Sequence, residues 1–171
     1  ALPSIASVSR LIISSTMLQE EHGWKLEGRQ SSEPEPFSSQ QQGTTIEVND
    51  LFYNVPARKK FLRTERTEFN HIDALFKTLA LSHPHVGLRL THNRKMVYQL
   101  PAACDESSMN LRLSRVCGKE FSNSLLNIDV EVDELKLQGW VALPTFSRSQ
   151  ADMQYFFVNR RMVRDKVISH A

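Results

Sequence analysis

The sequence is poor in cysteine and has no long apolar run. Its two cysteines, Cys104 and Cys117, are too few for a disulfide framework and lack metal-ligand spacing. We interpret both as ordinary thiols of a reducing compartment. No run approaches the ~18 apolar residues of a membrane-spanning helix, and the N-terminal residues lack the cationic start of a secretory signal. These absences exclude a disulfide scaffold and predict that no membrane is a partner.

Motifs that carry catalytic chemistry are also missing. There is no HExxH helix, GxSxG elbow, Walker lysine loop, CxxC pair or DxDxDG loop. The histidines show no paired-ligand spacing, and a helix-ending turn explains His83-Pro84-His85 better than a metal site. The residues by themselves therefore predict no catalytic group and no metal ligand.

The chain does have an ordinary globular composition with unevenly placed charge. Its 171 residues suffice for one domain or two small ones, with 40% of residues apolar and 23% charged. The net charge is +2, but residues 57–66 carry +4 and residues 160–166 carry +3, so the rest sums to −5. This polarity indicates a charged partner and says little about the fold.

Periodicity divides the first part of the chain into strands, a polar loop and two helices. Residues 5–14 and 44–52 have the apolar bulk of strands, whereas Glu27–Gln42 has the composition of a solvated loop. Pro56 suits the first turn of a short basic helix. Residues 86–92 and 95–100 alternate as a hairpin that turns at Asn93 and Arg94. Between them we expect a longer helix, capped by Thr67 and ended by His83-Pro84, whose buried stripe is Phe69, Ile72, Phe76, Leu79 and Ala80.

The second part of the chain follows a polar stretch, residues 101–110, that has linker character. We place a domain boundary there, which gives domains 1–103 and 104–171. Ser107 or Ser108 is expected to cap a helix over 110–117 that Gly118 ends. Strands are expected at 127–133, 135–143 and 153–159, with a turn at Asp133-Glu134 and a final helix beginning near Arg164.

Two segments are candidate binding sites. Gly43-Thr44 opens a strand, where glycine allows close backbone approach to a phosphate and threonine offers a hydroxyl, although this is also a common way to leave a loop. In the basic helix, a spacing of 100° per residue puts Lys59 near Arg63 and Arg66. That face is either solvated or bound to nucleic acid. The aromatic residues do not interleave with the cations, which favours duplex backbone over single-strand stacking.

One long segment identifies a family. GTTIEVNDLFYNVPARKKFLRTERTEFNHID closely resembles a segment of the MutL family of DNA mismatch repair proteins, bacterial members above all. ALPSIASVSRL, LQGWVALP and QYFFVNRRMVRDKVISHA resemble the same family in the same order. The resemblance implies an α+β fold: the C-terminal part of an ATPase α/β sandwich of the gyrase, Hsp90 and MutL type, then the start of a domain like ribosomal protein S5.

The resemblance also implies which chemistry to expect. The family's catalytic base, magnesium-binding asparagine and Asp-x-Gly-x-Gly motif lie upstream, and Ala1-Leu2 would end its GFRGEAL loop. Its phosphate-reaching lysine lies downstream. Gly43 and Thr44 match the family's nucleotide motif. ATP and Mg²⁺ are therefore expected cofactors of the full-length protein, while this fragment is expected to bind neither and not to hydrolyse ATP.

The expected DNA contacts follow from the same resemblance. Lys60 matches the family's cation after the PAR motif, and Lys166 matches a groove position that is usually arginine. We expect Arg58, Lys60, Arg63, Arg164 and Lys166 to contact phosphates without sequence choice. The sequence departs from the family pattern at two positions. Asn159 is usually followed by glycine in the family, and Arg160 here disfavours a tight primed turn. Pro3 replaces an alanine and puts the first helical turn in doubt.

The function implied is that of a MutL matchmaker in DNA mismatch repair. ATP binding would drive dimer closure around DNA and couple mismatch recognition by MutS to strand incision and excision. DNA, MutS, a downstream endonuclease and helicase, and a second MutL copy are the implied partners, in the cytoplasm at the nucleoid. Two alternatives stay open: a non-catalytic nucleic-acid module with an S5-like domain, and a structural dimer interface whose cations are solvated.

Overall fold

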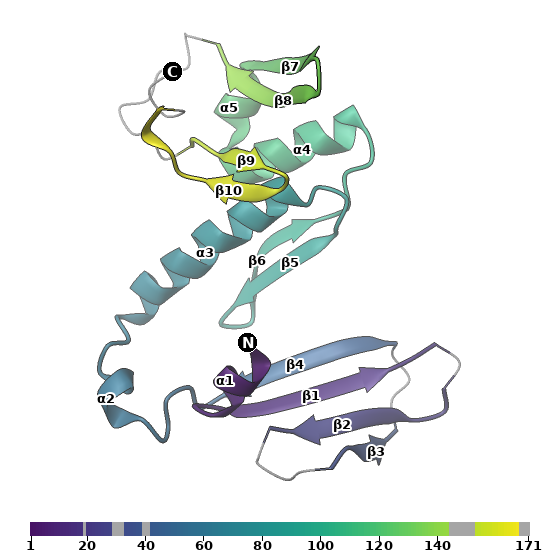
Figure 1. Cartoon of the computed structure of the whole chain (residues 1–171), viewed down its shortest axis with the longest axis vertical. Coiled ribbons are helices and arrows are strands. Elements are labelled where there is room, and N and C mark those ends of the chain that lie inside the picture. The colour runs from purple at the N-terminus through teal and green to yellow at the C-terminus, as the bar shows by residue number, and fades with distance from the viewer. Residues whose placement is uncertain (19, 29–32, 39–41, 144–152, 168–171) are drawn as a thin grey trace. The chain divides into compact units, whose positions relative to one another are not determined.

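The computed structural model describes residues 1–18, 20–28, 33–38, 42–143 and 153–167. By its contacts the chain forms two compact units, Ala1–Glu68 and Phe69–Ala171. Both contain helices and antiparallel strand pairs (Figure 1), which confirms the expected α+β class. The expected domain boundary at residues 103/104 stays a prediction.

The first unit is a four-stranded antiparallel sheet with a short helix at its N-terminus. Helix α1 (Leu2–Ala6) precedes strands β1 (Arg10–Thr16), β2 (Gly23–Glu27), β3 (Glu35–Phe37) and β4 (Gly43–Asn49). The spatial order is β3-β2-β1-β4. Leu11 of β1 is buried and pairs with Val48 of β4, whose side chain is 45% exposed.

Two expectations for this unit were wrong. The segment 5–14 was predicted as one strand, but Ile5 belongs to α1 and the strand begins at Arg10. Pro3 stands in the first turn of α1, where its missing N–H would have no intrahelical partner in any case. Part of the predicted loop 27–42 is strand, because Glu35–Phe37 pairs with β2; residues 29–32 and 39–41 lie outside the described residues.

Strand β4 ends earlier than predicted, at Asn49. Asp50 and Phe52 both have positive φ, 51° and 62°, which turns the chain sharply out of the sheet. The Phe52 N–H donates to the Val8 carbonyl at 2.7 Å, and the Asn54 side chain donates to the Ser7 carbonyl at 2.8 Å. These bonds tie the turn to the junction of α1 and β1 and fix the start of helix α2 (Pro56–Lys59).

Helix α3 (Glu65–Ser82) begins earlier than its predicted cap at Thr67. The Thr64 hydroxyl accepts the Thr67 N–H at 3.3 Å, so Thr64 performs the capping and Thr67 is helical. The helix ends before His83-Pro84, as predicted. Phe76 and Ala80 are buried as expected, but Ile72 and Leu79 are 50% and 43% exposed, so the buried stripe is narrower than predicted.

The core of the second unit joins α3 to a hairpin and a further helix. Strands β5 (Leu88–His92) and β6 (Lys95–Leu100) form the predicted hairpin, and α4 (Glu106–Cys117) packs against β6. Phe76 stacks on Tyr98 with ring centroids 5.2 Å apart. The buried cluster consists of Phe76, Ala80, Leu100 and Val116.

Helix α4 has a different cap from either serine proposed. Asp105 is the N-cap, and its carboxylate accepts the Ser108 N–H at 2.7 Å while the Ser108 hydroxyl accepts the Asp105 N–H at 3.1 Å. This reciprocal pair is a capping box, and its hydrogen bonds lower the pKa of Asp105. Gly118 ends the helix as predicted, with a φ of 96° that favours glycine.

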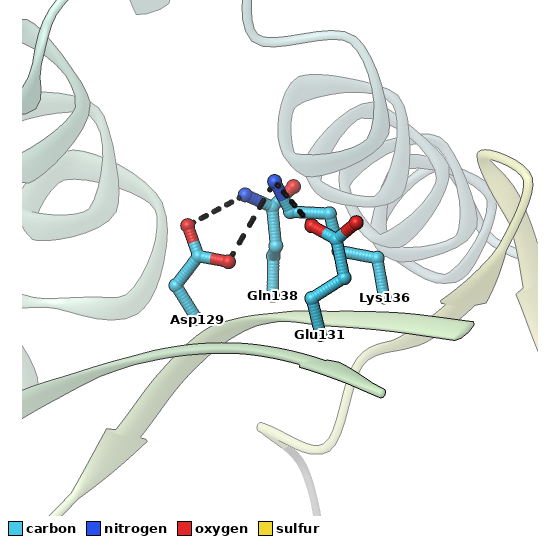
Figure 2. A network of polar contacts seen from close by, with 4 residues as sticks. All are labelled: Asp129, Glu131, Lys136 and Gln138. Carbon is cyan, nitrogen blue, oxygen red and sulfur yellow. Dashed lines mark hydrogen bonds and ion pairs between the residues drawn. The ribbon is translucent and has the colours of Figure 1, made fainter. Parts of the chain in front are cut away.

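The last elements are a short helix and two hairpins. Helix α5 (Lys119–Ser122) leads into β7 (Leu125–Val132) and β8 (Leu135–Ala142), which turn at Asp133 as predicted. One face of this hairpin carries a polar network of Asp129, Glu131, Lys136 and Gln138 (Figure 2). The other is apolar and exposed, with cross-strand pairs Leu126 to Val141, Val130 to Leu137 and Val132 to Leu135.

The final hairpin contains a strand that was not predicted. Strand β9 (Phe156–Val158) lies within the segment expected to be extended, and β10 (Arg161–Val163) pairs with it. Helical residues begin at Lys166, close to Arg164, near which the final helix was predicted to begin; residues 168–171 lie outside the described residues. In the described part of the chain, no helix is long and apolar enough to cross a membrane.

Candidate nucleic-acid interface

The candidate nucleotide residues lie at the start of β4. Gly43 has a φ of 130°, a conformation that residues with a side chain rarely adopt, and a Cβ there would meet no atom within 4 Å. The Thr44 hydroxyl shares a 2.9 Å hydrogen bond with the Ser15 hydroxyl on β1. Open backbone beside an exposed hydroxyl fits a contact with a nucleotide phosphate. The nucleotide role of both residues stays a prediction.

Three of the five candidate DNA contacts lie together after β4. Arg58 is in α2, Lys60 is the residue that ends it, and Arg63 follows within three residues. The helix was predicted to continue through Arg66, but it stops at Lys59. Lys59, Arg63 and Arg66 therefore do not share one helical face. The chain is instead held by Glu68, whose carboxylate accepts the Arg63 N–H at 2.8 Å.

The other two candidates follow β10 in the second unit. Arg164 comes directly after the strand, and Lys166 starts the helical residues. The Asp165 carboxylate accepts the Val167 N–H at 2.7 Å, which fixes the turn between the two cations. Both side chains are exposed. Because they belong to a different unit from Lys60, a single surface that contains all five candidates stays a prediction.

None of the five candidates forms an ion pair with a carboxylate in the described ranges. Some other cations, in contrast, have carboxylate partners. Arg10 pairs with Asp50 at 3.2 Å and lies over the Tyr53 ring, while Lys136 lies between Asp129 and Glu131 (Figure 2). The positive charge of the five candidates therefore remains available to a polyanion.

The turn at Asn159-Arg160 corrects an expectation. Arginine after Asn159 was expected to disfavour a tight primed turn, yet both residues have positive φ, 48° and 66°. Asn93 and Arg94 adopt nearly the same angles, 50° and 63°. Strand pairing on both sides fixes each turn, and this outweighs the cost of a left-handed arginine.

A buried arginine on α4 was missed by the sequence reasoning. Arg112 is 2% exposed, and its guanidinium donates to the carbonyls of Ala80, Pro101 and Val86 at 2.8, 2.6 and 2.8 Å. It also reaches the His83 carbonyl at 3.5 Å. Burial lowers its pKa. The one signal of its burial in the sequence is that Arg112 shares the apolar face of the helix with Met109, Leu113 and Val116.

A second polar group lies between α3 and β6. The Lys77 amine pairs with the Asp73 carboxylate at 2.8 Å. Burial lowers the pKa of Lys77, but hydrogen bonds and charge from Asp73 and Tyr98 outweigh it, so its pKa is raised. Burial and the Asp73 hydrogen bond raise the pKa of Tyr98. Both side chains therefore stay protonated near neutral pH. Over the described residues, no group of three or more His, Cys, Asp or Glu could hold a metal ion.

The two thiols should differ sharply in reactivity. Burial raises the pKa of Cys117 to about 11, whereas Cys104 is exposed. Because the thiolate is the nucleophile, roughly one Cys117 thiol in a thousand is reactive at pH 8.

We expect iodoacetamide at pH 8 to alkylate Cys104 well before Cys117, as followed by peptide mass spectrometry over time. In denaturant both should react alike. Equal native rates would contradict the burial of Cys117.

Comparisons with known proteins agree on one family. The family described as "DNA mismatch repair protein, C-terminal domain" matches residues 113–171. The DNA mismatch repair protein MutL of Chromohalobacter salexigens is 48% identical over the whole chain, and that of Pseudomonas entomophila is 47% identical. The chain spans 27% of the length of each.

Solved structures give the same result. The Aquifex aeolicus MutL ATPase domain complexed with ADP matches with a TM-score of 0.80 and 28% identity, over 99% of this chain and 64% of that one. Another structure of this ATPase domain matches with a TM-score of 0.74 and 27% identity, over 96% of this chain and 61% of that one. The chain belongs to the MutL family of DNA mismatch repair proteins, and its fold is that of part of the MutL ATPase region.

Proposed function

We propose that the chain acts in DNA mismatch repair, as the part of a MutL protein that contacts the DNA backbone without sequence preference. The observation that carries this is the set of exposed cations without carboxylate partners at Arg58, Lys60, Arg63, Arg164 and Lys166. Phosphate contacts need charge and exposure but no base-reading geometry. The identity to MutL along the whole chain supports the assignment.

The finer steps of the proposal concern the longer protein. ATP would contact the open backbone at Gly43 and the Thr44 hydroxyl, and Mg²⁺ would neutralise its phosphates. The ADP named for the Aquifex aeolicus structure supports a nucleotide in this region of the family. Nucleotide binding would close a MutL homodimer around DNA in the cytoplasm and relay mismatch recognition by MutS to an endonuclease and a helicase.

The DNA assignment is tested by reversing one candidate charge in each unit. Each lost phosphate contact reduces the slope of log affinity against log salt by about 0.9, so Lys60→Glu with Lys166→Glu should reduce it by about 1.8. Between about 50 and 200 mM salt, the unaltered protein should then lose about 12-fold more affinity for duplex DNA than the variant. Fluorescence anisotropy with a labelled duplex of mixed sequence measures this.

The matched control reverses one cation per unit at other positions. Lys25, a partly exposed residue that pairs with Glu27, and Lys119 of α5, which is exposed, serve this purpose as Lys25→Glu with Lys119→Glu. The control should keep the slope of the unaltered protein. If the Lys60 and Lys166 variant kept both its affinity and its slope, these residues would not contact DNA.

A further inference from the structure

The hairpin β5–β6 carries cations that the proposed DNA contacts do not include. Residues 84–104 contain Arg89, Arg94 and Lys95 but no aspartate or glutamate. Arg115 of α4 joins them, because its guanidinium donates to the Gln99 carbonyl on β6. All four cationic side chains are exposed. We call Arg89, Arg94, Lys95 and Arg115 the hairpin basic surface.

The strand pattern places Arg89 on the outer side of the hairpin. Leu90 and Tyr98 face each other across the strands and pack against the buried cluster of the second unit. Arg89 and Gln99 pair at the neighbouring position and therefore lie on the opposite side of the hairpin. A groove of about 830 Å³ beside the hairpin is lined by Arg89 and Arg115 together with inward-packing residues such as Tyr98. Arg89 thus lies on the outer side, whereas Lys95 pairs with His92 and lies on the side that faces α3.

The cations of this surface have no carboxylate partner among the described residues. No Asp or Glu there lies within ion-pair distance of Arg89, Arg94, Lys95 or Arg115. Lys77, on the inner side, is instead paired with Asp73. An unpaired cation keeps its full attraction for an anionic partner, whereas a paired one must first break its own contact.

The tip of the hairpin retains an arginine at a conformational cost. Arg94 has a φ of 63°, a region that is unfavourable for a residue with a side chain and that glycine occupies freely. Glycine would therefore suit the turn better than arginine does. Arginine places an exposed cation in the turn, directly before Lys95.

We propose that the hairpin basic surface binds phosphates of the duplex DNA backbone. Arg89 and Arg94 are five residues apart, so the cations extend over about 17 Å of strand. Along the helix axis of duplex DNA, that length covers about five base-pair steps of 3.4 Å. An extended polyanion fits this spacing better than a single nucleotide does. The inference rests on the proposed DNA-binding function and adds a contact that this function does not require.

Ring stacking does not compete with phosphate binding here. The Tyr98 ring stacks on Phe76, and the His92 ring stacks on Phe69 at 4.0 Å. Both aromatic rings of the hairpin strands are thus engaged with α3, and the outer face offers charge and not a platform for bases. Binding should accordingly be insensitive to sequence and strongly dependent on salt.

The test removes two charges without disturbing the fold. Arg89→Gln keeps a long polar side chain on an exposed strand position, and Arg94→Asn suits the left-handed turn. The double variant should reduce the salt slope for duplex DNA by about 1.8, so its affinity should fall most at low salt. Lys119→Gln with Lys136→Gln removes the same charge from other positions of the second unit and should leave the slope unchanged.

Three results would overturn the inference, and they are distinguishable. An unchanged slope in the hairpin variant, with normal DNA binding by the unaltered protein, overturns the hairpin contact alone. Failure of the unaltered protein to bind DNA overturns both this inference and the proposed function. Weakened binding of polyglutamate with unchanged DNA binding identifies an acidic protein as the partner instead. Circular dichroism melting confirms that each variant is folded.

Discussion

Replacement of Arg112 by alanine should unfold the second unit or leave it barely stable. The substitution removes the donors for the carbonyls of Ala80, Pro101 and Val86, all within 2.8 Å, and opens a cavity where the side chain was. A buried polar group left without its partner costs about 1–3 kcal/mol. With several carbonyls affected at once, we expect a loss of at least 3–5 kcal/mol, about the cost of breaking a buried charged contact.

The large effect follows from what the guanidinium joins. Ala80 is in α3, Val86 precedes β5 and Pro101 follows β6, so one side chain of α4 ties three segments together. Its planar fork reaches several carbonyls at once, which a lysine amine cannot do from a single position. Arg112→Lys should therefore recover only part of the stability.

The measurement is urea unfolding followed by circular dichroism, with Arg115→Ala as the matched control. Arg115 is on the same helix and also bonds a carbonyl, but it is exposed. Its loss should cost about 1 kcal/mol or less. If both alanine variants had the same unfolding midpoint, Arg112 would not be the structural centre of this unit.

Replacement of Gly23 by alanine should destabilise the first unit by about 1–3 kcal/mol. A Cβ at Gly23 would lie 2.3 Å from the Thr16 hydroxyl and 2.5 Å from Cε1 of Phe37. Thr16 and Gly23 are buried, and Phe37 is the strand partner of Gly23. β1 and β3 would therefore have to move away from β2 to make room.

Gly139 provides the control for this substitution. It also lies in a strand, β8, but a Cβ there would meet nothing within 4 Å. Gly139→Ala should be neutral or slightly stabilising, because alanine has less conformational freedom to lose on folding. Thermal melting of both variants compares the two glycines. A Gly23→Ala protein as stable as Gly139→Ala would show that β3 does not pack closely against β2.

Several elements of the fold could be predicted because their signals are local. Pro56 fixed the start of α2, Gly118 ended α4, and the alternation around Asn93-Arg94 gave a hairpin with the correct turn. Backbone restriction and side-chain alternation act within a few residues, so one sequence suffices to detect them. The family followed from a long block of residues around the PAR motif.

The predictions that failed concern the ends of helices, where several neighbouring residues could act as the cap. Thr64 and Asp105 cap their helices in place of Thr67 and the two serines proposed, since several adjacent residues could cap and only the path of the chain selects one. The basic helix was expected to continue through Arg66. It stops at Lys59 because Thr64 caps a new helix and Glu68 holds the Arg63 N–H.

The family, the α+β class and the positions of the positive charge can be predicted from the residues alone, because these depend on residue identity and local pattern. Which of the cations are buried and which stay exposed depends on the three-dimensional packing. Arg112 and Arg115 are three residues apart on one helix, yet one is buried among carbonyls and the other lies beside an open groove. Their difference depends on segments far along the chain that fold against one side of α4 and leave the other to solvent.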